Sequence, residues 1–186
     1  MDQTPSLQIR RSRASEWRVL RDLRLRALES DPLAFGSTLA QERALDDERW
    51  RDRATSESES STSARWVAED TSGRLVGSLV IAEVERKVYV FGMWVEPQHR
   101  GWGIGARLLD AGLTWARSRF PGRPVHLDVN PRQTAAIRLY ESRGFLRSAP
   151  DRPLGHTPGE SRYEMMLQAP ESPDREPKNG RATAGL

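Results

Sequence analysis

The chain contains no cysteine. This absence excludes disulfide bonds, thiolate metal sites and a cysteine nucleophile within the sequence. No apolar run reaches about 18 residues, the length that crosses a bilayer, and the first residues lack the apolar core of a signal peptide. We therefore expect no membrane-spanning segment and no membrane partner. A chain without cysteine is compatible with a reducing compartment, and we expect a cytoplasmic protein.

Apolar residues are also fewer than usual. Of the 186 residues, 37% are hydrophobic and 30% are charged, and the formal net charge is +3. This length fits one globular domain, which we place at residues 1–168. Residues 169–186 are rich in proline and charge without apolar periodicity, so we predict a disordered C-terminal tail. The positive excess, carried mostly by arginine, is too diffuse to indicate nucleic-acid binding but suits an anionic cofactor.

Hydrophobic periodicity divides the chain into helices and strands. An apolar stripe predicts a first helix from Glu16, capped by Ser15, and Asp31-Pro32 ends it. The polar segment Ser56–Ser63 has no apolar anchor, so we predict a mobile loop there. Further helices are expected at about 37–44, 47–54, 103–119 and 133–143, and strands at about 7–9, 65–69, 75–84, 88–95, 125–129, 145–147 and 163–167.

The stretch Val88–Ala116 organises the rest of the chain. A β-branched and aromatic run predicts a strand, and Gly101, Gly103 and Gly105 then open directly into a helical pattern. Glycines let a ligand approach the backbone, and the unpaired N–H groups and dipole of a helix's first turn favour an anion. Arg100 adds a charge-assisted donor beside them. The pattern predicts a binding site for a pyrophosphate.

The same glycines permit a second interpretation. Gly101–Ala106 fits G-x-G-x-x-A, the pattern of a dinucleotide-binding turn, and Asp128 follows at a strand end. We rank this alternative, an NAD(P)-binding domain, below the first. The turn follows a predicted antiparallel meander, whereas the dinucleotide fingerprint opens a doubly wound parallel sheet. A P-loop is excluded because no Gly-Lys-Ser/Thr follows the glycines.

Two motifs occur in order along the chain. The first is Gln/Arg-x-x-Gly-x-Gly/Ala after a central strand, present in two frames that start at Gln98 and Arg100. The second is Ala-Ile-x-Leu-Tyr-x-x-x-Gly-Phe, present at Ala136–Phe145. Together they resemble the GNAT superfamily of acyl-CoA-dependent N-acetyltransferases. The resemblance extends over about Leu7–Leu167 and leaves only the tail unexplained.

The resemblance implies a fold and a cofactor. The fold is a mixed α+β (α/β) domain whose central, mostly antiparallel sheet is splayed between strands 4 and 5 and flanked by helices on both faces. The acyl donor is acetyl-CoA, with its pantetheine arm along a free strand edge and its pyrophosphate on the glycine turn. The cofactor-binding residues implied are Met93, Trp94, Val95, Gln98, Arg100, Gly101, Trp102, Gly103, Ile104, Gly105, Ala106, Asn130, Gln133 and Tyr140.

The resemblance also implies catalytic roles. Tyr140 would lie near the thioester sulfur, where a phenol can donate a proton to the leaving thiolate. The family usually has asparagine three residues before Ala136, where this chain has Gln133; Asn130, at the strand end, is the candidate to substitute for it. Without cysteine, the acceptor would attack bound acetyl-CoA directly, with orientation supplying most of the acceleration.

The general base is less well defined. An alkylammonium has a pKa near 10 and must lose a proton before it attacks. The organising strand has no acid between Val88 and Val95, and we select Glu83, on the preceding strand, as the base. The other carboxylates considered are Glu42, Glu85, Glu96 and Asp128. The three histidines, His99, His126 and His156, predict no metal site.

The acceptor site is expected near Phe35 and Glu42, on the segment after the first helix. Its substrate would be the amine of a small molecule or a peptide, and its exact identity stays open. Dimers are common among such proteins, so a homodimer also stays open. We keep three functional classes: an N-acetyltransferase, an NAD(P)-binding domain and a non-catalytic CoA-binding module.

Overall fold

The computed structural model describes residues 7–169. Of the predicted tail, residues 170–186 lie outside this range. The strands are β1 (Gln8–Arg11), β2 (Ser63–Glu69), β3 (Leu75–Val84), β4 (Lys87–Val95), β5 (Val125–Val129), β6 (Leu146–Arg147), β7 (Arg152–Pro153) and β8 (Ser161–Leu167). The helices are α1 (Trp17–Ser30), α2 (Leu39–Arg43), α3 (Asp47–Glu59), α4 (Ile104–Arg119) and α5 (Thr134–Glu141), and 3-10 turns lie at Ala14–Glu16, Pro32–Ala34 and Pro97–His99. In this part of the chain, none of the helices combines the length and apolar character that crossing a bilayer requires.

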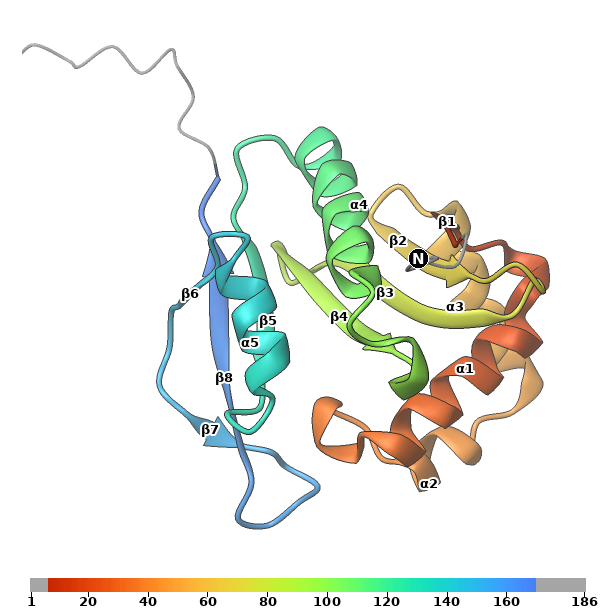
Figure 1. Ribbon diagram of the computed structural model, residues 1–186, viewed down its shortest axis with the longest axis horizontal. Coiled ribbons are helices and arrows are strands. Elements are labelled where there is room, and N and C mark those ends of the chain that lie inside the picture. The colour runs from red at the N-terminus through yellow and green to blue at the C-terminus, as the bar shows by residue number, and fades with distance from the viewer. Residues whose placement is uncertain (1–6, 170–186) are drawn as a thin grey trace, which may run out of the picture.

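The strands form one sheet in the order β1-β2-β3-β4-β5-β8-β6, with β7 paired to β8 beside this path. Among the described residues, only β4 and β5 pair in parallel, and their ladder joins residues 88–90 to residues 125–127. Beyond Val90 the two strands diverge (Figure 1). The edge of β4 from Phe91 to Val95 that faces β5 therefore has no partner strand among residues 7–169. This arrangement confirms the expected mostly antiparallel sheet with a splay between strands 4 and 5.

The same topology removes the structural basis of the dinucleotide alternative. A doubly wound sheet needs successive parallel strands with helical crossovers, and the glycine fingerprint opens the first of them. Here β2, β3 and β4 form an antiparallel meander before the glycine turn. Within residues 7–169, one parallel pair is all that the sheet contains.

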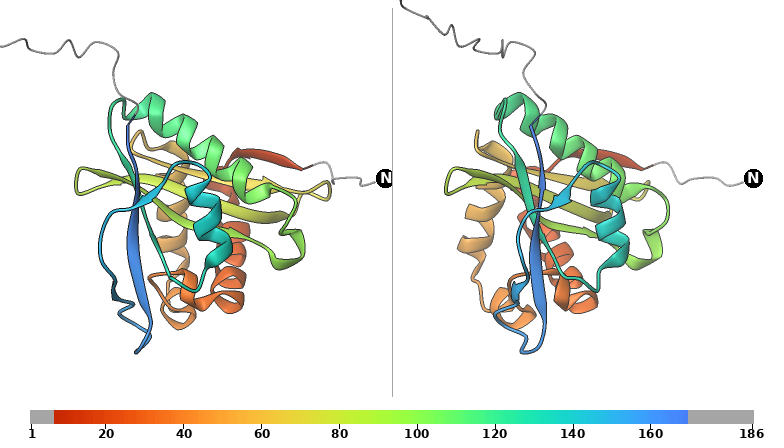
Figure 2. Two further views of the ribbon diagram at one scale, coloured as in Figure 1. Left: turned by 60° about the vertical axis from the view of Figure 1, so that its left-hand side comes forward. Right: turned by 90° about the vertical axis from the view of Figure 1, so that its left-hand side faces the viewer.

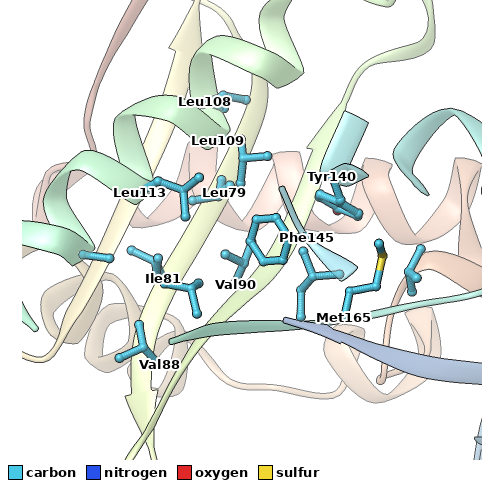
Figure 3. Close-up of a cluster of buried hydrophobic side chains, with 14 of the residues drawn as sticks. Leu79, Ile81, Val88, Val90, Leu108, Leu109, Leu113, Tyr140, Phe145 and Met165 are labelled. Carbon is cyan, nitrogen blue, oxygen red and sulfur yellow. The ribbon is translucent and has the colours of Figure 1, made fainter. Parts of the chain in front are cut away.

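Helices cover both faces of the sheet, as expected (Figure 2). On one face, α4 packs against β2 and β3. Leu108, Leu109 and Leu113 of α4 meet Leu79 and Ile81 of β3 in a large buried cluster (Figure 3). On the opposite face, α1 and α3 pack against the sheet around a second apolar cluster. The two cores pack against opposite faces of the sheet, and the edge of β4 that diverges from β5 stays without a partner strand among residues 7–169.

Polar caps set where two of the helices begin. The Thr38 hydroxyl accepts the Gln41 N–H at 3.2 Å, and the Gln41 side chain accepts the Thr38 N–H at 2.8 Å, which starts α2. Asp46 accepts the Arg49 N–H at 2.8 Å and starts α3. The prediction that Ser15 caps the first helix is wrong, because a 3-10 turn precedes α1 and places Glu16 at its N-cap.

The prediction of a mobile loop over Ser56–Ser63 is wrong in its first half, because α3 continues to Glu59. The Ser58 hydroxyl donates to the carbonyl of Ala54 at 2.8 Å. Glu57 accepts a hydrogen bond from Arg65 of β2 at 2.5 Å, and Arg11 donates to the carbonyl of Ser58 at 3.0 Å. Hydrogen bonds to the sheet thus hold a helix end that has no apolar anchor of its own.

Gly112 sets how closely α4 approaches the sheet. A Cβ at this position would lie 2.6 Å from Cδ2 of Leu79, which is fully buried. We expect Gly112→Ala to lower the free energy of unfolding by roughly 1–2 kcal/mol, because overpacking outweighs the gain in helix propensity. Gly155→Ala is the control, since a Cβ there meets no described atom within 4 Å. Urea denaturation measures the free energy of unfolding of both variants. An unchanged value for Gly112→Ala would show that α4 can move away from the sheet.

Candidate active site

The turn between β4 and α4 presents backbone rather than side chains. Gly101 and Gly103 have φ angles of 84° and 72°, a left-handed conformation that favours glycine. A Cβ added at either position would meet no described atom within 4 Å. The Arg107 N–H donates to the carbonyl of Gly103 at 3.0 Å, so the amides of residues 104–106 precede the first helical hydrogen bond. Open space, free amides and the positive end of the α4 dipole together fit a phosphate group.

A cavity of about 520 Å³ begins at this turn and continues between β4 and α5; we call it the donor cavity. Most residues expected to bind the cofactor line it: Met93, Trp94, Val95, Arg100, Gly101, Gly103, Ile104, Gly105, Ala106, Gln133 and Tyr140. Three residues that also line it, Asp31, Arg132 and Thr134, are not among those predicted to bind the cofactor. Arg132 and Thr134 flank the start of α5, and the Asn130-Pro131 step before that helix is the signal that could have indicated them.

Three of the residues expected to bind the cofactor do not line the donor cavity. Gln98 lies exposed in a 3-10 turn. Trp102 is 44% exposed, and its ring makes an edge contact with His99 at 5.5 Å between centroids. Asn130 is buried, and its side-chain oxygen accepts the Arg132 N–H at 2.9 Å. Asn130 therefore shapes the loop that leads into α5.

Arg100 is held by contacts that bring distant residues together. Its Nε donates to the carbonyl of Val95 at 2.8 Å, and its Nη2 donates to Asp31 at 2.5 Å. Asp31 also accepts hydrogen bonds from Trp94 at 2.8 Å and from Ser30 at 2.5 Å. Burial raises the pKa of Asp31, but the hydrogen bonds from Arg100, Ser30 and Trp94 outweigh it, and the pKa lies below its ordinary value. Asp31, which the sequence marked only as a helix stop, thus fixes an arginine at the mouth of the donor cavity.

The pH dependence of the stability of Asp31→Asn tests the contact between Asp31 and Arg100. A carboxylate with a depressed folded-state pKa stabilises the fold above its unfolded pKa, and that stabilisation is lost as pH falls through the folded pKa. The difference in free energy of unfolding between wild type and Asp31→Asn should therefore be largest at neutral pH and shrink below the ordinary pKa of 3.8. Urea denaturation at several pH values measures it, with exposed Asp52→Asn as control. A difference constant between about pH 3 and pH 7 would contradict this account.

A second cavity, of about 580 Å³, lies against the other side of the splay; we call it the acceptor cavity. It is lined by Phe35 from the segment after α1, by Tyr89 and Phe91 of β4, and by residues of β5, β7 and β8. Phe35 lines this cavity, and its role in binding an acceptor stays a prediction. Ala34, Met93, Gln133, Ala136 and Tyr140 line both cavities. A ligand in each cavity would meet the other at these shared residues.

Tyr140 lies at this junction. It belongs to α5, is 7% exposed, and its ring lies 5.9 Å from the ring of Phe145 at the end of the large buried cluster (Figure 3). Burial raises the pKa of the Tyr140 phenol above its ordinary value of 10.0. The hydroxyl therefore stays protonated at neutral pH and can act as a hydrogen-bond or proton donor.

Glu83 lines neither cavity, although Val84 and Glu85, which follow it, line the acceptor cavity. Glu83 pairs with Val88 near the tip of the β3–β4 hairpin, and Arg123 holds its carboxylate at 2.6 Å. Its position gives no support to a role as general base. Glu96 is also engaged, in ion pairs with Arg26 and Arg74.

Glu42 is part of a buried ionic cluster. Its carboxylate accepts hydrogen bonds from Ser37 at 2.7 Å, from Arg53 at 2.6 Å and from Arg24 at 3.4 Å. Burial raises the pKa of Glu42, but Ser37 and the two arginines outweigh it and hold the pKa below its ordinary value. Glu42 lines a separate cavity of about 420 Å³ that shares Arg24, Phe91 and Gly92 with the acceptor cavity. Glu42 therefore does not line the acceptor cavity but contacts two residues that do, Arg24 and Ser37.

Comparisons with known sequences agree with this geometry. A sequence model described as the Acetyltransferase (GNAT) family matches residues 20–145. N-alpha-acetyltransferase RimI of Mycobacterium tuberculosis is 33% identical over 125 residues, which cover 64% of this chain and 75% of that protein. Mycothiol acetyltransferase of Salinispora arenicola is 36% identical over 132 residues, which cover 67% of this chain and 39% of that protein. The matches to three mycothiol acetyltransferases span only 20–39% of those proteins.

A solved structure shares the fold. It is yncA, a putative acetyltransferase from Salmonella typhimurium, solved with its cofactor acetyl-CoA. It matches with a TM-score of 0.74 at 20% sequence identity, over 91% of this chain and 99% of that chain. The family match over residues 20–145, the splayed sheet and the glycine turn all agree. The chain therefore belongs to the GNAT family of acetyltransferases.

Proposed function

We propose that the protein transfers an acetyl group from acetyl-CoA to an amine of a small molecule or peptide. One observation carries the proposal: two cavities meet at Met93 and Tyr140, and one of them begins at the free amides of a helix start. A two-substrate transfer needs this arrangement, because both reactants must reach one point from different sides.

The glycine turn and the first turn of α4 would hold the diphosphate of the donor. Met93, Trp94 and Val95 lie on the part of β4 that diverges from β5, and the unpaired backbone groups of this part would meet the amides of the pantetheine arm. The Val95 carbonyl also accepts a hydrogen bond from Arg100. Gln133 lines both cavities, at the place where the family usually has asparagine. When bound, acetyl-CoA supplies an activated acyl carbon at the junction of the two cavities.

The chain's own residues then support the direct transfer of the acetyl group to the acceptor nitrogen. The acceptor nitrogen forms a bond to the acyl carbon while the carbon–sulfur bond breaks. Tyr140 donates its phenolic proton to the leaving sulfur and recovers a proton, through solvent, from the acceptor nitrogen as the amide forms. Since the sequence has no cysteine, no acyl-cysteine relay forms on this chain. Orientation of the two reactants supplies a large part of the acceleration.

We propose Asp128, in place of Glu83, as the group that receives the ammonium proton, directly or through water. Asp128 lines the acceptor cavity, where Arg152 and Arg162 pair with its carboxylate. Asp128→Asn should lower kcat/KM at neutral pH by about 10²-fold, whereas Glu83→Gln should leave it unchanged. Activity of Asp128→Asn should recover as pH rises toward the amine pKa near 10. Equal losses of kcat/KM in Asp128→Asn and Glu83→Gln would exclude Asp128 as the group that receives the proton.

Ligand binding and thiol release together test the proposal. Acetyl-CoA at about 100 times its Kd should stabilise the fold by about 2.7 kcal/mol in thermal denaturation, and NADPH should have no effect. Thiol release should require an added amine. Stabilisation by NADPH alone would contradict the proposal. Binding of acetyl-CoA without thiol release for any amine would instead indicate a non-catalytic CoA-binding module.

The names of the relatives do not identify the acceptor of this protein. They are named for different acceptors, an alpha-amino group in RimI and mycothiol in the others. Both peptide and small-molecule amines therefore stay within the proposal. The cytoplasmic location and a homodimer stay predictions.

A further inference from the structure

The residues that line the acceptor cavity include more arginines than carboxylates. Arg24, Arg152 and Arg162 line it, together with the carboxylates of Asp128 and Glu85. Arg152 forms a close pair with Asp128, and Glu85 lies in the exposed hairpin turn. Arg24 and Arg162 have longer ion pairs, with Glu42 at 3.4 Å and with Asp128 at 3.6 Å, and are the cations with donors left for a ligand.

Arg24 reaches the cavity from α1. Its guanidinium stacks over the Phe35 ring at 4.3 Å, and its Nη2 donates to Ser37 at 2.9 Å and Glu42 at 3.4 Å. Its Nη1 lies 3.9 Å from the position of a Cβ on Gly92 and donates to no described residue. Gly92 has no side chain, so this position of β4 leaves space beside the nitrogen. Burial and the nearby Arg65 and Arg53 lower the pKa of Arg24 more than Glu42 raises it.

Arg162 extends from β8, on the opposite wall of the acceptor cavity, toward Gly36. Its Nη1 lies 3.4 Å from the position of a Cβ on Gly36, next to Phe35. The distance from this nitrogen to Asp128 is 3.6 Å, beyond a hydrogen bond. Its Nε is buried and has no hydrogen-bond partner among the described residues. Two guanidinium groups with free donors thus converge on the Phe35–Gly36 corner.

We propose that Arg24 and Arg162 bind a carboxylate of the acceptor, so that the acceptor is an amine that also carries a carboxylate. The inference rests on the proposed acetyl transfer and narrows its substrate class. A guanidinium matches a carboxylate with paired, charge-assisted hydrogen bonds. A buried donor without a partner is costly, and a ligand anion would satisfy it. The acceptor amine would extend from this corner toward Tyr140, which lines the same cavity.

The same charges disfavour the opposite substrate class. A polyamine would bring additional cations against two arginines in a partly buried cavity, where like charges repel more strongly than in water. Carboxylate-bearing amines, such as free amino acids, fit the charge pattern of the cavity.

The test uses the full chain and ligand pairs that differ only at the carboxylate. L-phenylalanine, L-leucine and 4-aminobutyrate are each compared with the corresponding carboxamide. Calorimetry measures their binding to the CoA complex, and thiol release from acetyl-CoA measures kcat/KM. The free acids should be favoured by at least about tenfold in at least one pair. Arg162→Gln and Arg24→Gln should each reduce that preference to about twofold or less, provided thermal denaturation shows a folded protein.

Arg117→Gln, at an exposed arginine of α4 that lines neither cavity, is the matched control and should keep the preference. A preference below about twofold in all pairs, or one that survives Arg162→Gln, overturns the carboxylate site. Thiol release with the carboxamides would then leave the proposed acetyl transfer standing. If acetyl-CoA neither binds nor reacts, the proposed function fails, and this inference fails with it.

Discussion

Gly103→Val is expected to weaken acetyl-CoA binding by at least about a hundredfold while the protein stays folded. Gly103 adopts a φ of 72° at the N-cap of α4, and open space lies where its Cβ would be. We place the diphosphate in that space. A branched side chain there would displace the phosphate from several free amides, and charge-assisted hydrogen bonds contribute roughly 1.5–3 kcal/mol each. Calorimetric titration with acetyl-CoA measures the loss.

Gly122→Val is a closely matched control for this experiment. Gly122 has the same φ of 72°, and a Cβ there also meets no described atom within 4 Å, but it lies in the turn after α4, outside both cavities. Both variants place a β-branched residue in the left-handed region and should lose about 1–2 kcal/mol of stability. Only Gly103→Val should lose acetyl-CoA affinity. Similar affinities in the two variants would show that the phosphate does not bind at the glycine turn.

Tyr140→Phe is expected to lower kcat by about 10²-fold or more and to change the Kd of acetyl-CoA by less than about twofold. The substitution removes one hydroxyl from the junction of the two cavities and keeps the ring that packs near Phe145. The proton donor to the leaving sulfur is lost, whereas the contacts of the diphosphate and pantetheine are kept. Stopped-flow or steady-state thiol release and calorimetry separate the two effects.

Tyr163→Phe is the control, because Tyr163 is also buried but lines neither cavity. The pH profile gives a further check. Burial raises the pKa of Tyr140 above 10.0, and the phenol is needed in its protonated form. Wild-type activity should therefore show no loss from Tyr140 ionisation up to about pH 10. Unchanged kcat in Tyr140→Phe would remove the acid role.

Local sequence chemistry predicted the parts of the site that depend on backbone conformation. Gly101 and Gly103 were recognisable because a positive φ between a strand and a helix is a glycine property. The α5 segment was recognisable from its motif, which put Tyr140 on a helix facing the core. The splay of the sheet came from the family resemblance, since strand order cannot be inferred from the periodicity of a single strand.

Contacts between residues distant in sequence were not predictable in this way. Asp31 reaches Arg100 across 69 positions, and Arg162 comes within 3.4 Å of the Cβ position of Gly36. No local pattern marks either pair. Glu83 lines neither cavity, although Val84 and Glu85 beside it line the acceptor cavity, and its carboxylate pairs with Arg123 instead. Glu57 lies in the last turns of α3, where the sequence predicts a loop, and the contact that supports this helix end comes from Arg65 of a later strand.

A crystal structure of the full chain with acetyl-CoA is the most direct test of the central claim. The account predicts diphosphate density within hydrogen-bond distance of the amides of residues 103–106, and the thioester beside Tyr140 where the two cavities meet. Density for the cofactor at any other surface, with the glycine turn empty, would contradict it.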